Sequence, residues 1–130
     1  MSSFIAKVKK IQKCDSLHLL TLESSKIEIT LVTLELSSDI KVDKEVRILY
    51  KPTHVTVAKD FSGSFSDENQ LPCTVKSVEN GELLSSIELD FFGTRLDSII
   101  TKASSQKMSL TQDEQVTAFI NPSELSLEAL

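Results

Sequence analysis

The chain contains the same pattern of residues twice, and this internal repeat constrains its fold more than any other feature. Three pairs of stretches match: "AKVKKI" from Ala6 with "CTVKSV" from Cys73, "EITLVT" at 28–33 with "LDSIIT" at 96–101, and "EVRILY" from Glu45 with "QVTAFI" from Gln115. Their spacings are 67, 68 and 70 residues. A spacing that grows in small steps is typical of a tandem repeat with short loop insertions. The 130 residues are therefore predicted to form two copies of one unit of about 65 residues.

Each copy is predicted to be a small β-unit. Its apolar residues alternate over short runs rich in β-branched side chains, with turn signals such as "ENG" at 79–81 between them. Two segments look helical, "LELSSDI" after Thr33 and "KASSQKM" after Thr101, and each is about two turns long. The fold class is therefore all-β with short helices. The order of elements suits two five-stranded barrels of the oligonucleotide/oligosaccharide-binding (OB) type in tandem.

A segment rich in Gly, Ser and acidic residues separates the copies and is predicted to be a linker at residues 61–68. It divides the chain into a first domain of residues 1–60 and a second of residues 69–130. Residues 1–60 carry 10 Lys and Arg against 8 Asp and Glu, whereas residues 61–130 carry 4 against 11. The acidic second half and the seven aromatic residues, six Phe and one Tyr, argue against nucleic-acid binding.

No apolar run is long enough to span a membrane and no secretory signal is recognised, so a cytoplasmic location is expected. Cys14 and Cys73 have no metal-ligand spacing and are interpreted as ordinary thiols. His18 and His54 are the only histidines, and neither lies in a nucleophile or metal motif. The chain is therefore predicted not to be an enzyme and to hold no metal ion directly.

The second copy resembles the molybdate-binding Mop or TOBE domain family. The resemblance rests on "NQLPCTVKSVENGELLSSIEL" from Asn69, on "LDSIITKASSQKM" from Leu96, and on "QVTAFINPSEL" from Gln115. It implies OB-like barrels that exchange strands between units, and assembly into a homodimer or homotrimer. It also implies molybdate or tungstate, held by hydrogen bonds at contacts between units, in storage, homeostasis or sensing. A separate regulator or transporter component is a possible partner.

A tetrahedral dianion has only acceptor oxygens, so its site needs converging hydroxyls, backbone N–H groups or basic side chains. Carried over residue by residue, the family pattern implies eight oxyanion-binding residues: Thr30, Thr33, Lys51, Thr53, Ser66, Ser98, Thr101 and Ser123. Two substitutions weaken this pattern. Asn121 stands where the second copy should repeat Lys51, and Glu68 stands where the family has arginine. A carboxylate close to a dianion is repulsive.

Two functions therefore remain open on the sequence. The first is an intracellular molybdate- or tungstate-binding protein whose sites form between units. The second is an oligomerisation or regulatory module of the same fold that has lost anion binding. A response of the protein's stability to molybdate distinguishes them.

Overall fold

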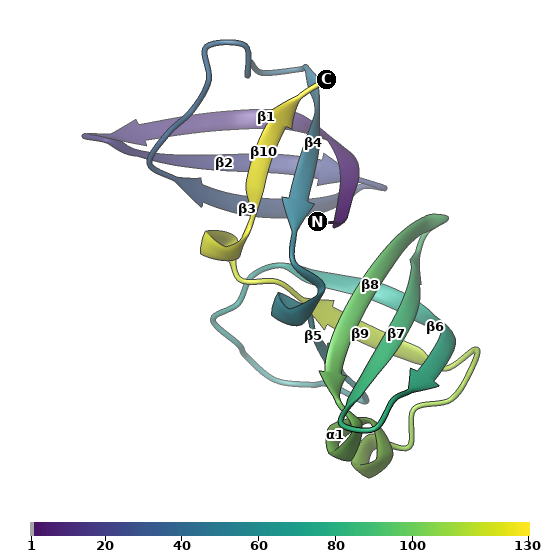
Figure 1. Cartoon of the computed structure of the whole chain (residues 1–130). Coiled ribbons are helices and arrows are strands. Elements are labelled where there is room, and N and C mark those ends of the chain that lie inside the picture. The colour runs from purple at the N-terminus through teal and green to yellow at the C-terminus, as the bar shows by residue number, and fades with distance from the viewer. Residues whose placement is uncertain (1) are drawn as a thin grey trace.

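The computed structural model describes residues 2–130. The chain forms two curled five-stranded antiparallel sheets, which lie next to each other as two separate bodies (Figure 1). In order across the sheet, the first contains β10 (Ser126–Ala129), β4 (Glu45–Tyr50), β1 (Ser2–Cys14), β2 (Leu17–Ser24) and β3 (Ile27–Thr33). The second contains β5 (Thr56–Ala58), β9 (Gln115–Phe119), β6 (Gln70–Asn80), β7 (Leu84–Phe91) and β8 (Thr94–Thr101). The prediction of an all-β chain with two five-stranded units is confirmed.

Each sheet takes its fifth strand from the other half of the chain. After β4, the 3-10 turn η1 (Pro52–His54) leads into β5, where Val57 pairs with Ala118 of β9. After β9, the turn η2 (Pro122–Glu124) leads into β10, where Leu127 pairs with Ile48 of β4. In Figure 1 the yellow β10 accordingly lies beside the blue β4, far from the green strands of its own half. The two halves are thus joined by reciprocal backbone pairing as well as by the linker.

The exchange has an approximate two-fold symmetry. His54 of η1 and Glu124 of η2 occupy equivalent positions of the repeat, and their Nδ1 and Oε2 atoms lie 2.9 Å apart. Residues at equivalent positions meet only where a two-fold axis passes between them. The two turns therefore face each other across this axis. Each lies against the strand of the opposite half that carries the repeated pattern "EITLVT" or "LDSIIT", here called the motif strand: η1 against β8 and η2 against β3.

The core follows from the alternation along the strands. In β1, Phe4, Ala6 and Val8 point inward and are almost fully buried, while the lysines between and beyond them point to solvent. The equivalent inward residues of β6 are Leu71, Cys73 and Val75. Both strands carry a bulge at the same place, after Val8 and after Val75, so the spacing of 67 residues is kept in three dimensions.

The motif strands are aligned differently from the sequence prediction. Leu20 pairs with Leu31 in the first sheet, whereas its equivalent Ile87 pairs with Ser98 in the second. Ser98 therefore corresponds to Leu31 at a spacing of 67, and the predicted spacing of 68 is wrong for this strand. Because neighbouring residues of a strand point to opposite faces, Thr30 and Ser98 lie on opposite faces of their sheets. Thr30 is partly exposed, and Ser98 is buried in a core position.

Only one of the two predicted helices is present. Residues 102–108 form α1 (Lys102–Met108), in which the Thr101 hydroxyl accepts the N–H of Ser104 and Ser109 ends the helix in the left-handed conformation. The prediction of a helix after Thr33 is wrong, since Leu34–Ile40 is a bend followed by a turn. The spacing of the repeat rises to 70 in the next strand. Ala6 pairs with Val46 and its equivalent Cys73 pairs with Val116, so Val46 and Val116 are equivalent. The first copy thus has three residues fewer for this connection.

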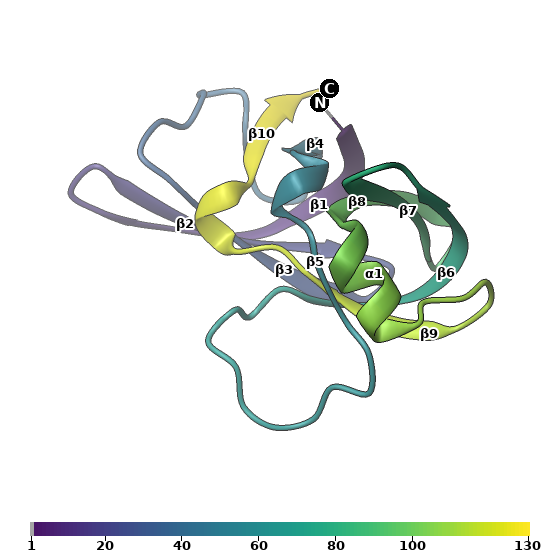
Figure 2. The same cartoon turned by 60° about the horizontal axis from the view of Figure 1, so that its bottom comes forward.

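Residues 61–68 contain no helix or strand and arch away from the sheets (Figure 2). Two phenylalanines anchor this loop: Phe61 and Phe65 each lie with ring centroids 5.0 Å from that of Phe119 on β9, at tilted or edge-on angles. Before the loop, Lys59 Nζ lies 2.7 Å from Glu114 Oε2. The division into domains at this loop stays a prediction. Within residues 2–130, no helix has the length and apolar character needed to cross a membrane.

Candidate oxyanion site

The crossing of the two halves creates two grooves at equivalent places. The first, here called the η1 groove, has a volume of about 360 Å³. It is lined by Thr53, Val55, Thr56, Val57, Leu84, Ile99, Ile100, Thr101, Ser104 and Met108. The second, here called the η2 groove, has a volume of about 540 Å³ and is lined by Leu17, Val32, Thr33, Leu34, Glu35, Ser123 and Leu125. Each combines a turn of one half with the motif-strand end of the other, so neither groove exists in a single copy of the repeat.

The grooves bring together four of the eight predicted residues, in two pairs. Thr53 and Thr101 line the η1 groove, and Thr33 and Ser123 line the η2 groove. In each pair the two hydroxyls come from opposite halves of the chain. Thr56 and Ser104 add two hydroxyls to the η1 groove that were not predicted from the sequence. The signal for Ser104 was its position three residues after Thr101, where a helix N-cap finds its partner.

The η1 groove has hydroxyls that are free to donate. Thr53 is exposed, and its hydroxyl has no hydrogen-bond partner within residues 2–130. Thr101 Oγ1 lies 3.0 Å from Ser104 Oγ and accepts the Ser104 N–H at 3.1 Å. A pair of hydroxyls joined by one hydrogen bond keeps one hydrogen atom for a ligand. No acidic residue lines this groove.

The hydroxyls of the η2 groove are already engaged. Thr33 Oγ1 donates to the carbonyl of Glu35 at 3.0 Å and lies 3.3 Å from its N–H. Ser123 donates to Asn121 Oδ1 through both its hydroxyl, at 2.8 Å, and its N–H, at 3.0 Å. The carboxylate of Glu35 is the one charged side chain on the lining of this groove. These contacts make the η2 groove a poor binding site for an anion.

Thr30 lies outside both grooves and is bound by the segment before β6. Its N–H donates to Asn69 Oδ1 at 2.7 Å, and its carbonyl accepts from Asn69 Nδ2 at 2.8 Å. The same Nδ2 also donates to the Ile120 carbonyl at 2.8 Å, and Asn69 is only 1% exposed. The Thr30 hydroxyl lies 3.3 Å from Glu68 Oε2. Its hydroxyl and N–H are therefore both used within the chain.

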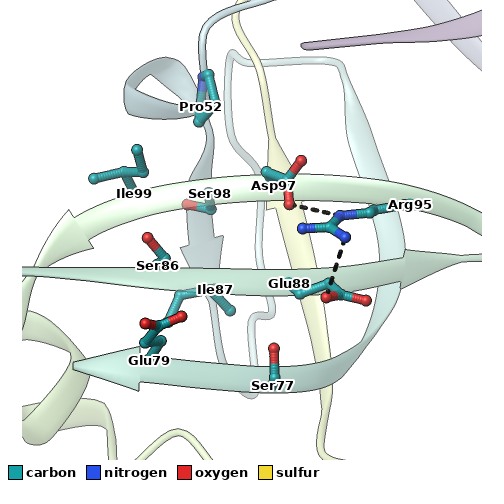
Figure 3. Close-up of a pocket in the computed structure, with 10 residues that line it drawn as sticks. All are labelled: Pro52, Ser77, Glu79, Ser86, Ile87, Glu88, Arg95, Asp97, Ser98 and Ile99. Carbon is teal, nitrogen blue, oxygen red and sulfur yellow. Dashed lines mark hydrogen bonds and ion pairs between the residues drawn. The ribbon is translucent and has the colours of Figure 1, made fainter. Parts of the chain in front are cut away.

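Ser98 lies at a third groove, here called the Arg95 groove, of about 350 Å³ (Figure 3). The Ser98 hydroxyl donates to the Val55 carbonyl at 2.7 Å and is 1% exposed. Figure 3 shows Arg95 reaching toward Asp97 and Glu88, whose oxygens lie 3.0 and 3.5 Å from its nitrogens. The hydrogen bond with Asp97 raises the pKa of the Arg95 guanidinium. With Glu79 also on its wall, this groove carries more negative than positive charge and disfavours an anion.

The remaining two predicted residues lie on exposed segments. Lys51 precedes η1 and makes no ion pair within residues 2–130, and Ser66 lies in the linker. Another lysine near the boundary is engaged, because Lys59 pairs with Glu114, and its hydrogen bond lowers the pKa of the Glu114 carboxyl. Lys51 is therefore available to a ligand or to a second copy of the chain.

Among residues 2–130, no three His, Cys, Asp or Glu side chains cluster closely enough to hold a metal ion. Of the two thiols, Cys14 is exposed and Cys73 is buried. Burial raises the pKa of the Cys73 thiol to about 12, so it remains protonated and unreactive near neutral pH. The η1 and η2 grooves themselves present threonine and serine hydroxyls, which form hydrogen bonds.

Comparisons with known proteins agree with this architecture. The family model of the TOBE domain matches residues 66–127. The second half of the chain is a TOBE domain. The resemblance predicted from the sequence is thus confirmed for the TOBE domain, and the first half repeats its fold.

The tandem arrangement also matches a solved structure. The cytoplasmic molybdate-binding protein ModG, in a crystal form with molybdate bound, superposes with a TM-score of 0.92. The match covers 99% of this chain and 96% of ModG at 24% sequence identity, so the two proteins share their fold. A molybdate-binding protein from Sporomusa ovata is 32% identical, and the match covers 45% of this chain and 88% of that protein with a TM-score of 0.44.

Among curated proteins, the molybdenum import ATP-binding protein ModC of Brucella abortus is 32% identical over 82 residues. ModC of Brucella suis matches to the same extent. The match covers 62% of this chain but only 23% of ModC, so the chain corresponds to less than a quarter of that protein.

Proposed function

We propose that this protein binds molybdate or tungstate as an intact oxyanion, at contacts between units of the tandem TOBE fold. The observation that carries the proposal is the pairing of hydroxyls from opposite halves in the η1 groove, Thr53 with Thr101. Such a groove offers donors without a carboxylate, which is what a tetrahedral dianion requires. The likeness to ModG and to the matched segment of ModC, whose names refer to molybdate and molybdenum, supports this choice of anion.

The site is completed by assembly. Within one chain the hydroxyls of the η1 groove have no cation on the groove lining, while Lys51 is exposed and unpaired among the described residues. We therefore place the ammonium of Lys51 against the groove of a second copy, in a homodimer or homotrimer. A charge-assisted hydrogen bond from lysine would add to those from the hydroxyls. Ser66, on the exposed linker, is a further candidate donor in such a contact.

The protein acts in the cytoplasm as a store, buffer or sensor of the oxyanion and performs no catalysis. We infer that it is coupled to a separate regulator or transporter component, because the matched relative ModC is named a molybdenum import ATP-binding protein. This last part of the proposal is tested by whether the purified chain changes ATP hydrolysis by such a transporter in the presence of molybdate.

Thermal unfolding with increasing sodium molybdate tests the binding proposal, with sulfate and chloride at matched ionic strength as controls. A ligand that binds only the native state raises its stability by RT ln(1 + [L]/Kd), about 2.7 kcal/mol at 100 times Kd. We expect the melting temperature to rise with molybdate and tungstate. We expect Lys51→Ala to reduce that rise without lowering the melting temperature of the anion-free protein, because the side chain is exposed.

The second candidate function is an oligomerisation or regulatory module that has lost anion binding. It is favoured by the contact of Thr30 with Glu68 and by the lack of a basic residue on the η1 and η2 groove linings. No change in melting temperature at millimolar molybdate, in a protein that remains oligomeric by light scattering, would make this the better description.

A further inference from the structure

We propose that the two equivalent grooves are functionally unequal: the η1 groove binds the oxyanion and the η2 groove does not. Each chain then binds no more than one molybdate, although it contains two copies of the fold. This inference rests on the proposed function and specifies which part of the chain carries it out.

The hydroxyls of the two grooves differ in their hydrogen bonds. Thr53 and Ser123 occupy equivalent positions in their turns, at the spacing of 70 residues. The Thr53 hydroxyl has no partner within residues 2–130, whereas Ser123 gives both its hydroxyl and its N–H to Asn121 Oδ1. An anion at the η2 groove would have to displace these bonds before it gained its own. An anion at the η1 groove meets a donor that is already free.

The two grooves also differ in the charges at equivalent positions. Where the first half has Lys51, the second has Asn121, whose side chain occupies the nearby donors. Glu35 lines the η2 groove, and Lys102 stands 67 residues later, at the equivalent place beside the η1 groove. Lys102 lines a hollow that shares Thr101 and Leu84 with the η1 groove. The η1 groove thus has no charged residue on its lining, with Lys102 and Glu82 in the adjoining hollow, whereas the η2 groove has a carboxylate on its lining.

Electrostatics favours the η1 groove. The carboxylate of Glu35 repels a dianion at the η2 groove, whereas the η1 lining carries no negative charge. Screening by salt reduces this repulsion and leaves its sign unchanged. The donors and the charges therefore favour the same groove.

Isothermal titration of the full chain with sodium molybdate tests the inference in two ways, through stoichiometry and through paired variants. Thr53→Val and Lys102→Ala change the η1 groove and its border, and Ser123→Ala and Glu35→Ala change the η2 groove. All four residues are exposed or partly exposed, so the variants are expected to fold, and Thr53→Ser serves as the conservative control that keeps the hydroxyl.

We expect at most one molybdate per chain. We also expect the association constant to fall by about tenfold or more in Thr53→Val, since a hydrogen bond to a charged group is lost. Thr53→Ser should retain the affinity, and Ser123→Ala and Glu35→Ala should not lower it. Two molybdates per chain, or an equal loss of affinity in the η2 variants, would overturn the inequality of the grooves while leaving the proposed function intact. A protein that binds no molybdate would refute the proposed function, and this inference with it.

Discussion

Asn69 holds Thr30 by both backbone groups: its Oδ1 accepts the Thr30 N–H at 2.7 Å and its Nδ2 donates to the Thr30 carbonyl at 2.8 Å. The side-chain amide thus pairs with the backbone of β3 in the way that a residue of a neighbouring strand would. Because Nδ2 also reaches the Ile120 carbonyl, this buried side chain joins β3 to the segment after β9 across the boundary between the halves.

Replacing Asn69 with alanine should lower the free energy of unfolding by about 2 kcal/mol or more, since the partly buried backbone groups of Thr30 and the buried carbonyl of Ile120 lose their partner. Urea unfolding followed by circular dichroism measures this. Ser66→Ala is the matched control, because Ser66 is exposed nearby, and it should change stability by less than about 0.5 kcal/mol. Equal stability of the two variants would show that Asn69 contributes nothing to joining the halves.

The two halves should be unable to fold separately. A fragment of residues 1–60 lacks β10, so β4 loses its outer neighbour and the ion pair of Arg47 with Glu128 at 2.9 Å is lost. A fragment of residues 61–130 lacks β5, which leaves β9 without Val57. We expect each fragment alone to show no cooperative thermal transition and an equimolar mixture to regain one. A cooperative transition in either isolated fragment would contradict this prediction and support independent domains.

Stability should fall at alkaline pH through the buried thiol of Cys73. The unfolded thiol ionises near pH 9.0, whereas the folded one keeps its proton up to about pH 12. Between these values the unfolded chain binds fewer protons than the folded chain, so the free energy of unfolding decreases as pH rises. The expected loss between pH 8 and pH 10 is about 1.4 kcal/mol.

Urea unfolding at pH 8, 9 and 10 measures this loss, and Cys73→Val should remove it. Tyr50 adds a loss of the same sign near pH 10, because burial raises the pKa of its folded hydroxyl above the ordinary value of 10.0, and this part should remain in Cys73→Val. Cys14→Ser is the matched control, since Cys14 is exposed and its replacement should leave the pH dependence unchanged. A pH dependence that is unchanged in Cys73→Val would assign the loss to other groups.

The η2 groove should gain anion binding when its charges are made like those of the η1 groove. Glu35→Lys with Asn121→Lys removes the carboxylate from the lining and releases Ser123 from Asn121. We expect the molybdate stoichiometry measured by titration to rise toward two per chain. The pair Gln12→Lys and Glu45→Lys produces the same change in net charge at exposed positions of the first sheet and should leave the stoichiometry unchanged. An equal rise in both double variants would indicate a general effect of net charge.

Much of this architecture could be predicted from the chain alone. Val8 and Val75 were matched by the repeat, and in the structure both lie on equivalent strands with a bulge directly after them. The helix after Thr101 was also predictable, because Thr101 is a good N-cap and Ser104 stands at the partner position. The helix expected after Thr33 does not form. There the connection is three residues shorter and Thr33 bonds instead to the backbone of Glu35.

The motif strand shows where sequence matching fails. Hydroxyls suggested that Thr30 and Ser98 are equivalent, yet the strand pairing makes Ser98 the equivalent of the buried Leu31. A strand has a side-chain period of two, so an alignment error of one residue exchanges the buried face for the exposed one. The hydroxyl pattern could not reveal this error, because serine and threonine occur on both faces.

The sequence by itself determined the two copies, their strands and the TOBE family of the second half, because these depend on local alternation and on the order of residues. Only the tertiary structure decided that β5 and β10 exchange sheets and that Thr53 meets Thr101 across the halves. It also decided that Asn69 binds Thr30. Such contacts join segments that are far apart in the sequence. Several segments could pair with the same strand edge, and the packing of the whole chain decides which one does.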